Sequence, residues 1–344
     1  MRFKHLRYKI LASVLASFIF LIVVLVLLGF FGSFSSPDKE VKWGITFSVL
    51  QATRLNLDWR QTYLSVLDDL KPHALRLPVY WSEIEKEEGQ FDFSFYDWQM
   101  DEAQKRDIST ILIIGRRLPR WPECHVPDWE QKLDKEKQDI ALLVYIRETV
   151  NHFKHYPNIY AWQIENEPFL SVFGECPETD ANFLSKEVDS VKALDASRPV
   201  IITDSGELGD WLRAAKRADI FGTTMYRRVP GWGIFGKYTT YPLPSSFYRW
   251  KANFVNHFVP IRKLIVAELQ GEPWAIGTSN VADISIAEQY RTVDPVYFKE
   301  IIKYAKNSGI GEIYWWGSEW WYWLKQGGHP EIWETAKVLF DGHN

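Results

Sequence analysis

Residues 159–168, IYAWQIENEP, combine a short apolar run with two glutamates that stand where the run ends. A run of this length, bounded by polar residues, is typical of a strand that is buried on both faces. The pattern therefore predicts a strand that ends near Glu165, with Asn166, Glu167 and Pro168 in the loop that follows it.

The same pattern recurs along the chain from residue 41. Apolar runs stand at residues 42–48, 73–79, 109–115, 159–165, 200–204, 219–225, 263–268 and 311–316, and amphipathic stretches of helical spacing separate most of them. Apolar strands that alternate with helices indicate a parallel sheet covered on both faces. Eight such units in about 304 residues predict an α/β fold, the (β/α)8 TIM barrel. A doubly wound sheet is the alternative, but no G-x-G-x-x-G turn follows any strand.

The first forty residues form a separate segment. Four basic residues lie within residues 1–9, whereas residues 10–31 are uncharged and mostly Leu, Val, Ile and Phe. This run is long enough to span a bilayer as a helix. We expect a cytoplasmic basic segment at 1–9, an uncleaved transmembrane anchor at 10–31, a linker at 32–40 and an extracytoplasmic domain at 41–344. A cleavable signal peptide is the alternative, although its apolar core is usually shorter, roughly 7–15 residues.

Charge and composition narrow the choice of partners. The 344-residue chain has a net charge of −4, and removing the four positive charges of residues 1–9 leaves −8 for the remainder. A mildly acidic domain argues against nucleic acid as a partner. The 17 tryptophans suit either a core or stacking on sugar rings. The histidines show no metal-binding spacing and no cofactor motif occurs, so we expect neither a metal nor a cofactor.

A barrel places its functional side chains at the C-terminal ends of the strands and in the loops that follow. Glu167 follows the fourth predicted strand and Glu268 closes the seventh. These strands face each other across the barrel mouth, so the two carboxyl groups can converge on one bond. Glycoside cleavage needs such a pair, in which one carboxyl group is protonated to serve the leaving oxygen and the other is ionised.

Three elements in barrel order resemble the retaining glycoside hydrolases of clan A. They are NEP after strand four, a lone glutamate closing strand seven, and LRLPVYWSEIEKEEGQFDFSFYDW at residues 75–98. The last segment is similar to the stretch after strand two in families 5, 39 and 42, which include cellulase-like and β-galactosidase-like enzymes. The resemblance implies that Glu167 is the general acid/base and Glu268 the nucleophile. We expect their carboxyl groups roughly 5–5.5 Å apart, as in retaining enzymes.

The resemblance also implies roles for supporting residues. Arg76 would keep the nucleophile ionised, Asn166 would hydrogen-bond the sugar 2-hydroxyl, and Tyr226 would hydrogen-bond the nucleophile. Trp316 would lie under the scissile sugar, or Trp315 if the register differs by one residue.

Two positions need separate interpretation. Family 5 enzymes usually carry histidine two residues before the strand-six tyrosine, where this chain has Thr224. Glu165 is interpreted as structural, hydrogen-bonded to Arg76 or to a side chain of strand five. The alternative is that Glu165 and Glu167 are both ordinary loop carboxylates.

The loop RRLPRWPECHVPDW, residues 116–129, would form one wall of the cleft. Arg117, Trp121 and His125 either contact substrate or only stiffen this loop, and both interpretations stay open. Cys124 in this loop and Cys176 in the next one are expected to form a disulfide, because adjacent strands have adjacent loops and the domain is expected outside the cytoplasm.

Two more stretches could line the mouth. The tryptophans of GSEWWYWL, residues 317–324, either stack on glycan or pack between the barrel and its last helix, and we expect some of each. Asp204, Ser205 and Glu207 follow strand five, where we favour a helix cap and first turn over a place in the site.

These features predict a membrane-anchored retaining glycosidase that cleaves a β-linked oligo- or polysaccharide by double displacement, a role in polysaccharide degradation. A transglycosylase would use the same barrel and the same covalent intermediate. A non-catalytic glycan-binding surface protein is the alternative outside enzymes, because the fold alone does not establish catalysis.

Overall fold

The structure is a computed structural model that describes residues 2–31, 40–231 and 236–342. Eight parallel strands close into a barrel in the order β1-β10-β9-β6-β5-β4-β3-β2. Each strand coincides with one apolar run of the sequence, although β9 continues two residues past Glu268, and the predicted eightfold barrel is confirmed. The strands are β1 (Lys42–Thr46), β2 (Ala74–Pro78), β3 (Ser109–Ile114), β4 (Ile159–Ile164), β5 (Val200–Asp204), β6 (Ile220–Met225), β9 (Leu264–Gln270) and β10 (Glu312–Trp316).

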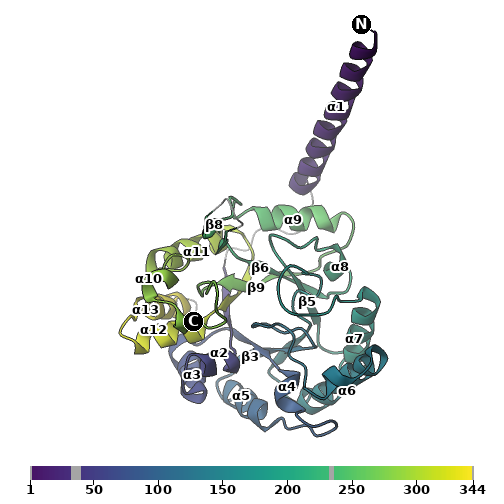
Figure 1. Cartoon of the computed structure of the whole chain (residues 1–344). Coiled ribbons are helices and arrows are strands. Elements are labelled where there is room, and N and C mark those ends of the chain that lie inside the picture. The colour runs from purple at the N-terminus through teal and green to yellow at the C-terminus, as the bar shows by residue number, and fades with distance from the viewer. Residues whose placement is uncertain (1, 32–39, 232–235, 343–344) are drawn as a thin grey trace.

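Helices follow the strands and surround the barrel (Figure 1). Carboxylates at Asp134, Asp180 and Asp294 cap three of the longer ones by accepting hydrogen bonds from first-turn N–H groups. In chain order the helices and helical turns are α2 (Val49–Arg54), α3 (Trp59–Ser65), η1 (Val66–Leu70), α4 (Trp81–Ile84), α5 (Ser94–Gln104), η2 (Glu130–Lys132), α6 (Lys135–Phe153), α7 (Ala181–Leu194), α8 (Leu212–Ala215), α9 (Phe247–Asn256), η4 (Val281–Asp283), α10 (Ile286–Gln289), α11 (Pro295–Asn307), α12 (Ser318–Gln326) and α13 (Glu331–Asp341).

The barrel interior is packed with side chains below its mouth. Gly44 of β1 faces the ring of Tyr314, and a Cβ atom at residue 44 would lie only 2.4 Å from Cδ1 of that ring. Glycine is therefore required here for the tyrosine to fill the lumen. The interior apolar cluster consists of Ala74, Ile111, Ala161, Ile201, Ile220, Ile265 and Tyr314. Functional side chains are consequently confined to the open end of the barrel.

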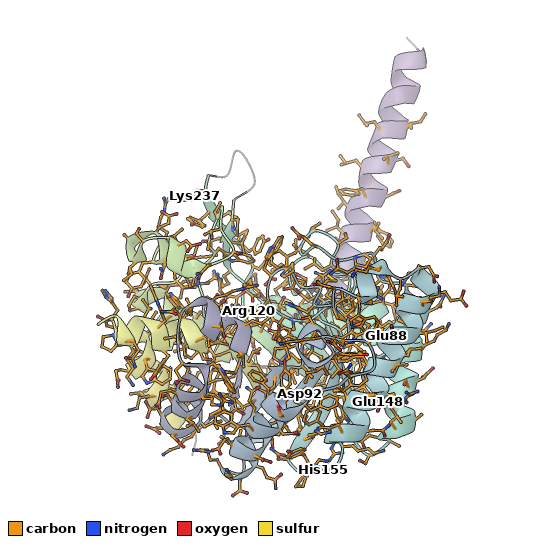
Figure 2. The ribbon with its side chains drawn as sticks, turned by 60° about the horizontal axis from the view of Figure 1, so that its bottom comes forward. Glu88, Asp92, Arg120, Glu148, His155 and Lys237 are labelled. Carbon is orange, nitrogen blue, oxygen red and sulfur yellow. A yellow bond between two sulfur atoms is a disulfide. The ribbon has the colours of Figure 1, made fainter. Side chains whose placement is uncertain are left out.

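One hairpin adds to the eight repeating units. Strands β7 (Arg228–Pro230) and β8 (Tyr238–Thr240) pair antiparallel between β6 and α9. This hairpin, which carries Lys237, extends from the barrel toward the same side as the N-terminal helix, whereas His155 lies at the opposite end (Figure 2). The alternating pattern of the sequence did not predict it.

Helix α1 (Arg2–Phe31) projects from the barrel near α9 (Figure 1). It begins at Arg2, so the predicted basic segment belongs to the same helix as residues 10–31. Within the described part of the chain, no helix has the length and hydropathy required to cross a membrane. The predicted anchor is therefore not confirmed. The predicted linker, residues 32–40, lies outside the described residues except for Glu40.

Candidate active site

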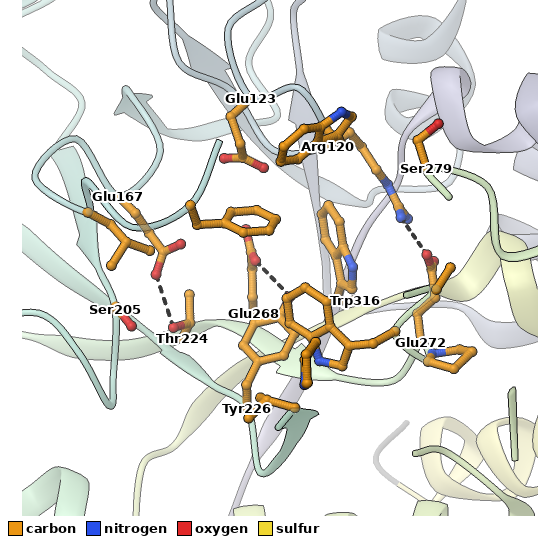
Figure 3. A pocket seen from close by; sticks show the side chains of 18 of the residues that line it. Arg120, Glu123, Glu167, Ser205, Thr224, Tyr226, Glu268, Glu272, Ser279 and Trp316 are labelled. Atoms are coloured by element: carbon orange, nitrogen blue, oxygen red, sulfur yellow. Dashed lines mark hydrogen bonds and ion pairs between the residues drawn. The ribbon is translucent and has the colours of Figure 1, made fainter. Parts of the chain in front are cut away.

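A cavity of about 820 Å³ opens at the C-terminal ends of the barrel strands (Figure 3). Its wall includes residues from the ends of β4, β5, β6, β9 and β10, as well as from α2 and the loop after β3. Both predicted acids, Glu167 and Glu268, line it. So do Asn166, Tyr226, Trp316 and Trp121 among the predicted supporting residues.

Glu268 is held by a cation and a phenol. Arg76 on β2 is fully buried, and its Nη1 donates to Glu268 Oε1 at 2.9 Å. The hydroxyl of Tyr226 donates to the other carboxylate oxygen, Oε2, at 3.0 Å. Arg76 also donates through Nη2 to Asn166 Oδ1 at 2.8 Å and through Nε to Gln163 Oε1 at 2.7 Å. A buried guanidinium and a hydroxyl donor both stabilise negative charge on Glu268.

Glu167 has the opposite environment. It lies just after β4 with a φ of 44°, and its backbone N–H donates to Thr203 Oγ1 at 2.9 Å. Its carboxyl oxygen Oε1 accepts a hydrogen bond from the Thr224 hydroxyl at 3.1 Å (Figure 3). No ion pair reaches Glu167 from any described residue. Burial raises the pKa of Glu167 well above its usual value, and the charge of Glu268 raises it further.

Thr224 therefore occupies a specific place beside the acid. Its hydroxyl accepts a hydrogen bond from the backbone N–H of Gly206 at 3.1 Å, which leaves its single hydrogen for Glu167 Oε1. Because Oε1 of Glu167 accepts this hydrogen bond, the proton of the carboxylic acid is placed on the other oxygen, Oε2. The residue that departs from the family 5 pattern thus orients the carboxyl group.

Glu165 is structural, but its predicted partners were wrong. It accepts hydrogen bonds from the backbone N–H groups of Arg116 at 2.7 Å and Arg117 at 2.6 Å, in the loop after β3. It also faces Glu187 of α7, and burial together with the Glu165 charge raises the pKa of Glu187 well above its usual value. Glu165 therefore interacts with Glu187 and with the loop after β3, and no hydrogen bond joins it to Arg76 or to a β5 side chain among the described residues.

The two tryptophans that end β10 point to opposite sides. Trp316 lines the cavity, and the Arg120 guanidinium lies 3.9 Å from the centroid of its ring. Trp315 is fully buried among aromatic rings, with Phe298 at 4.7 Å and Trp43 at 5.8 Å between centroids. Of these two candidates for a sugar platform, only Trp316 is accessible from the cavity.

The long loop after β3 contributes one of its three candidate residues to the cavity. Trp121 lines the cavity and is 38% exposed. Arg117 is buried, and it donates to the carbonyl oxygens of Leu170 at 2.9 Å and Phe173 at 2.7 Å. His125 is also buried and shares a hydrogen bond with a carbonyl oxygen of its own loop. Arg117 and His125 therefore shape this wall and do not reach the cavity.

A disulfide joins this wall to the neighbouring loop. Cys124 and Cys176 are bonded, with their Cα atoms 5.4 Å apart, as the sequence predicted. The bond closes a stretch of 52 residues that includes α6 and β4. It thereby ties the loop after β3 to the loop that follows Glu167.

The residues after β5 do not form the helix cap and first turn that the sequence predicted. Ser205 and Glu207 line the cavity, and helix α8 begins only at Leu212, so these residues form no helix cap or first turn. Asp204 lies beneath them and accepts hydrogen bonds from the N–H groups of Ser205 at 2.8 Å and Trp211 at 3.0 Å. Glu207 accepts from the N–H of Tyr226 at 3.0 Å. Burial raises the pKa of Glu207 to about 7.

The tryptophans of residues 317–324 pack in the core. Trp320 and Trp321 are fully buried and donate through their indole N–H groups to Gln289 Oε1 and to the Gly271 carbonyl, both at 2.7 Å. None of the three tryptophans in this stretch lines the cavity. Core packing is confirmed for Trp320 and Trp321, whereas Trp323 is half-buried.

The sequence interpretation missed two cavity carboxyl groups. Glu123, in the disulfide-linked loop, is 4% exposed and accepts a hydrogen bond from Asn166 Nδ2 at 3.2 Å. Glu272, four residues after Glu268, accepts from Arg120 at 2.8 Å and from Gln51 at 3.0 Å. Neither residue ends a strand, so the expectation that functional side chains stand at strand ends did not select them. An acid beside a cysteine in a predicted cleft wall was the available signal for Glu123.

Three or more metal-ligating side chains do not gather anywhere in the described residues. The cavity is lined by carboxyl groups, guanidinium groups, hydroxyls and aromatic rings. Within this cavity, burial raises the pKa of Glu167, and Glu268 is paired with the Arg76 guanidinium. Such a pair can transfer a proton and supply a nucleophile or base at the same bond.

Solved glycoside hydrolases share this barrel. A family 10 endo-β-1,4-xylanase from Gloeophyllum trabeum has a TM-score of 0.52 and 16% identity, over 82% of this chain and 87% of that one. GH5_18 from Streptomyces cattleya, in complex with GlcNAc, has a TM-score of 0.58 and 12% identity, over 82% and 71%. The exo-β-1,4-mannosidase Op5Man5 from Opitutaceae bacterium strain TAV5 has a TM-score of 0.57 and 15% identity, over 82% and 53%.

No family model and no curated protein matches the sequence. At 12–16% identity, the solved structures establish the fold. The barrel is the one found in glycoside hydrolases of families 5 and 10, in agreement with the resemblance that the sequence motifs carry.

Proposed function

We propose that this protein is a retaining glycoside hydrolase that cleaves a β-linked glycan by double displacement. The observation that carries the proposal is the contrast between two carboxyl groups in one cavity. Glu268 is paired with a buried guanidinium, whereas Glu167 has no ion pair among the described residues and a pKa raised well above its usual value. The raised pKa of Glu167 assigns it as the acid, and the ion pair with Arg76 assigns Glu268 as the nucleophile.

The proposed reaction has two steps. Protonated Glu167 donates its proton to the glycosidic oxygen while ionised Glu268 attacks the anomeric carbon, which breaks the glycosidic bond and forms a glycosyl ester on Glu268. Glu167, now ionised, then takes a proton from water as the water oxygen attacks the anomeric carbon. The sugar is released with retained configuration, Glu268 becomes ionised again and Glu167 is protonated again.

Supporting residues have roles that follow from their contacts. The Asn166 amide has a fixed orientation, because Oδ1 accepts from Arg76 and Nδ2 donates to Glu123, and we assign it to the substituent on C2 of the sugar. Trp316 offers the accessible ring on which the sugar would stack. Trp121 lies farther out on the wall and would contact a neighbouring sugar unit.

The test is an assay of the purified full-length protein on aryl β-glycosides and β-linked polysaccharides. We expect activity in the parent, loss of activity in Glu268→Ala, and unchanged activity in Glu136→Ala, which removes an exposed carboxylate of α6. Product analysis separates hydrolysis from transfer to another sugar. A parent that binds glycans but cleaves none of them would contradict the proposal and favour a glycan-binding protein.

We also propose that residues 10–31 anchor the protein in a membrane, with the barrel outside the cytoplasm. The support is the uncharged apolar sequence of this stretch and the high exposure of its described side chains, such as Phe20 at 71% and Leu11 at 65%. The disulfide supports an oxidising compartment. We expect the protein to sediment with membranes and to keep its N-terminus. A mature chain that begins near Ser36 would contradict the anchor.

A further inference from the structure

We propose that the sugar at the inner end of the cavity is a 2-amino sugar and that Glu123 binds its ammonium group. This inference specifies the substrate class of the proposed glycosidase and rests on that function. Its basis is a third carboxyl group, that of Glu123, which faces the same cavity as Glu167 and Glu268 (Figure 3).

The surrounding backbone holds Glu123 in place. Its φ is 74°, a conformation that is unfavourable for a residue with a side chain, and its N–H donates to the Arg120 carbonyl at 2.7 Å. The next residue, Cys124, is bonded to Cys176. Gly174 packs so closely that an added Cβ would lie 2.9 Å from the Glu123 Cβ. Strain that is fixed by a disulfide and by close packing is typical of a functional site.

The carboxyl group of Glu123 lines the cavity, where a ligand can reach it. Oε2 accepts from Asn166 Nδ2 at 3.2 Å, and the nearest cation, Nε of Arg117, is 3.9 Å from the same oxygen. The terminal nitrogens of Arg117 are turned to the carbonyl groups of Leu170 and Phe173. Asn166 is the side chain that donates to this carboxyl group among the described residues, and the Arg120 backbone contributes a further hydrogen bond. A carboxyl group this deeply buried needs a donor, and the cavity is where a donor can come from.

The cations around the cavity already have partners. Arg76 pairs with Glu268, and Arg120 pairs with Glu272 at 2.8 Å. Arg54 donates to the Trp121 carbonyl at 2.7 Å. None of them balances the charge of Glu123.

Arg117, with its Nε at 3.9 Å, is the cation nearest to Glu123 among the described residues. Burial raises the pKa of Glu123 to about 7; nearby Arg117 opposes this shift, and the charge of Glu268 adds to it. Glu167, across the cavity, is a further acid that interacts with Glu123. A ligand ammonium would supply a full positive charge and draw Glu123 into its ionised form, whereas a hydroxyl would supply only a dipole.

The contacts also indicate which ring position carries the amine. Hydrogen bonds connect Glu268 to Arg76, Arg76 to Asn166 and Asn166 to Glu123, so Glu123 and the nucleophile belong to one hydrogen-bonded network at the cavity wall. The nucleophile attacks C1, and the substituent closest to C1 on the ring is the one on C2. A 2-amino group is cationic at neutral pH, whereas its N-acetylated form is neutral and larger.

The test is calorimetric binding to the full-length protein, using glucosamine and galactosamine with glucose, galactose and N-acetylglucosamine as references. We expect an amino sugar to bind at least about tenfold more tightly than its hydroxyl counterpart, a difference of about 1.4 kcal/mol. Binding should also release protons near pH 7, because Glu123 ionises. Glu123→Gln should abolish both the preference and the proton release, and Glu175→Gln, on the exposed part of the linked loop, should preserve both.

Binding of the neutral sugars as tightly as the amino sugars would overturn the inference, and so would binding of neither. A preference that persists in Glu123→Gln would also overturn it. The measurement does not depend on cleavage, so the two proposals can fail separately. Cleavage of aryl β-glucosides together with tight glucose binding would reject the amino sugar and leave the glycosidase. Preferential binding of glucosamine without any cleavage would support the amino sugar and reject the glycosidase.

Discussion

Arg76 should be among the most costly residues of the barrel to replace. Its side chain is fully buried and donates to Glu268, Asn166, Gln163 and Thr46. Arg76→Met keeps the length of the side chain but removes the charge and every donor. Breaking a buried ion pair from one side costs about 3–5 kcal/mol, because the remaining charge has no partner. At about 2–4 °C per kcal/mol, the melting temperature should fall by roughly 6–20 °C.

The assays are thermal unfolding for the melting temperature and urea unfolding for the free energy, both followed by tryptophan fluorescence. Arg106→Met is the matched control, since Arg106 pairs with Asp68 where both side chains are partly exposed, at 26% and 56%. The control should lose about 1 kcal/mol or less. The double variant Arg76→Met/Glu268→Gln should recover most of the stability, because no uncompensated charge remains. An Arg76 variant no less stable than the control, or a double variant as unstable as the sum of both changes, would refute this reasoning.

Glu268→Gln removes a negative charge that raises the pKa of Glu167, so this pKa should fall in the variant. NMR titration of the carboxyl groups measures the pKa, and an unchanged value would contradict the prediction. Thr224→Val removes a donor that favours ionised Glu167, so the alkaline limb of the activity profile should move up by about one pH unit, whereas Thr224→Ser should keep the parent profile. Alkylation without reductant should leave Cys124 and Cys176 unmodified, and replacing both with serine should cost about 4 kcal/mol for the 52-residue stretch; two alkylated cysteines would exclude the bond.

The barrel could be predicted because its strands are buried on both faces and therefore read as unbroken apolar runs. The same regularity places Glu268 and Arg76 at one end of the barrel, where strand ends meet. Alternation along β10 also sends Trp315 and Trp316 to opposite faces. The alternation shows that the two side chains face opposite ways. Only the packing of Trp315 against Phe298 shows which of them is the core residue.

Contacts between distant segments could not be predicted in the same way. Glu165 meets Glu187 because α7 returns across β4, and no local pattern encodes that approach. Glu123 enters the cavity because a disulfide and tight packing fix an irregular loop. The helix expected after β5 begins only at Leu212, and the residues before it bring Glu207 into a hydrogen bond with the N–H of Tyr226, a contact between distant segments.

The central claim is that Glu268 is a nucleophile opposed by the acid Glu167. The most direct test analyses products by NMR, using an aryl β-glycoside that the parent protein cleaves. We predict that the parent releases the β-anomer first, and that inactive Glu268→Ala, supplied with azide, forms the α-glycosyl azide, because azide then attacks from the vacated side. First release of the α-anomer, or unchanged cleavage by Glu268→Ala without azide, would contradict the account.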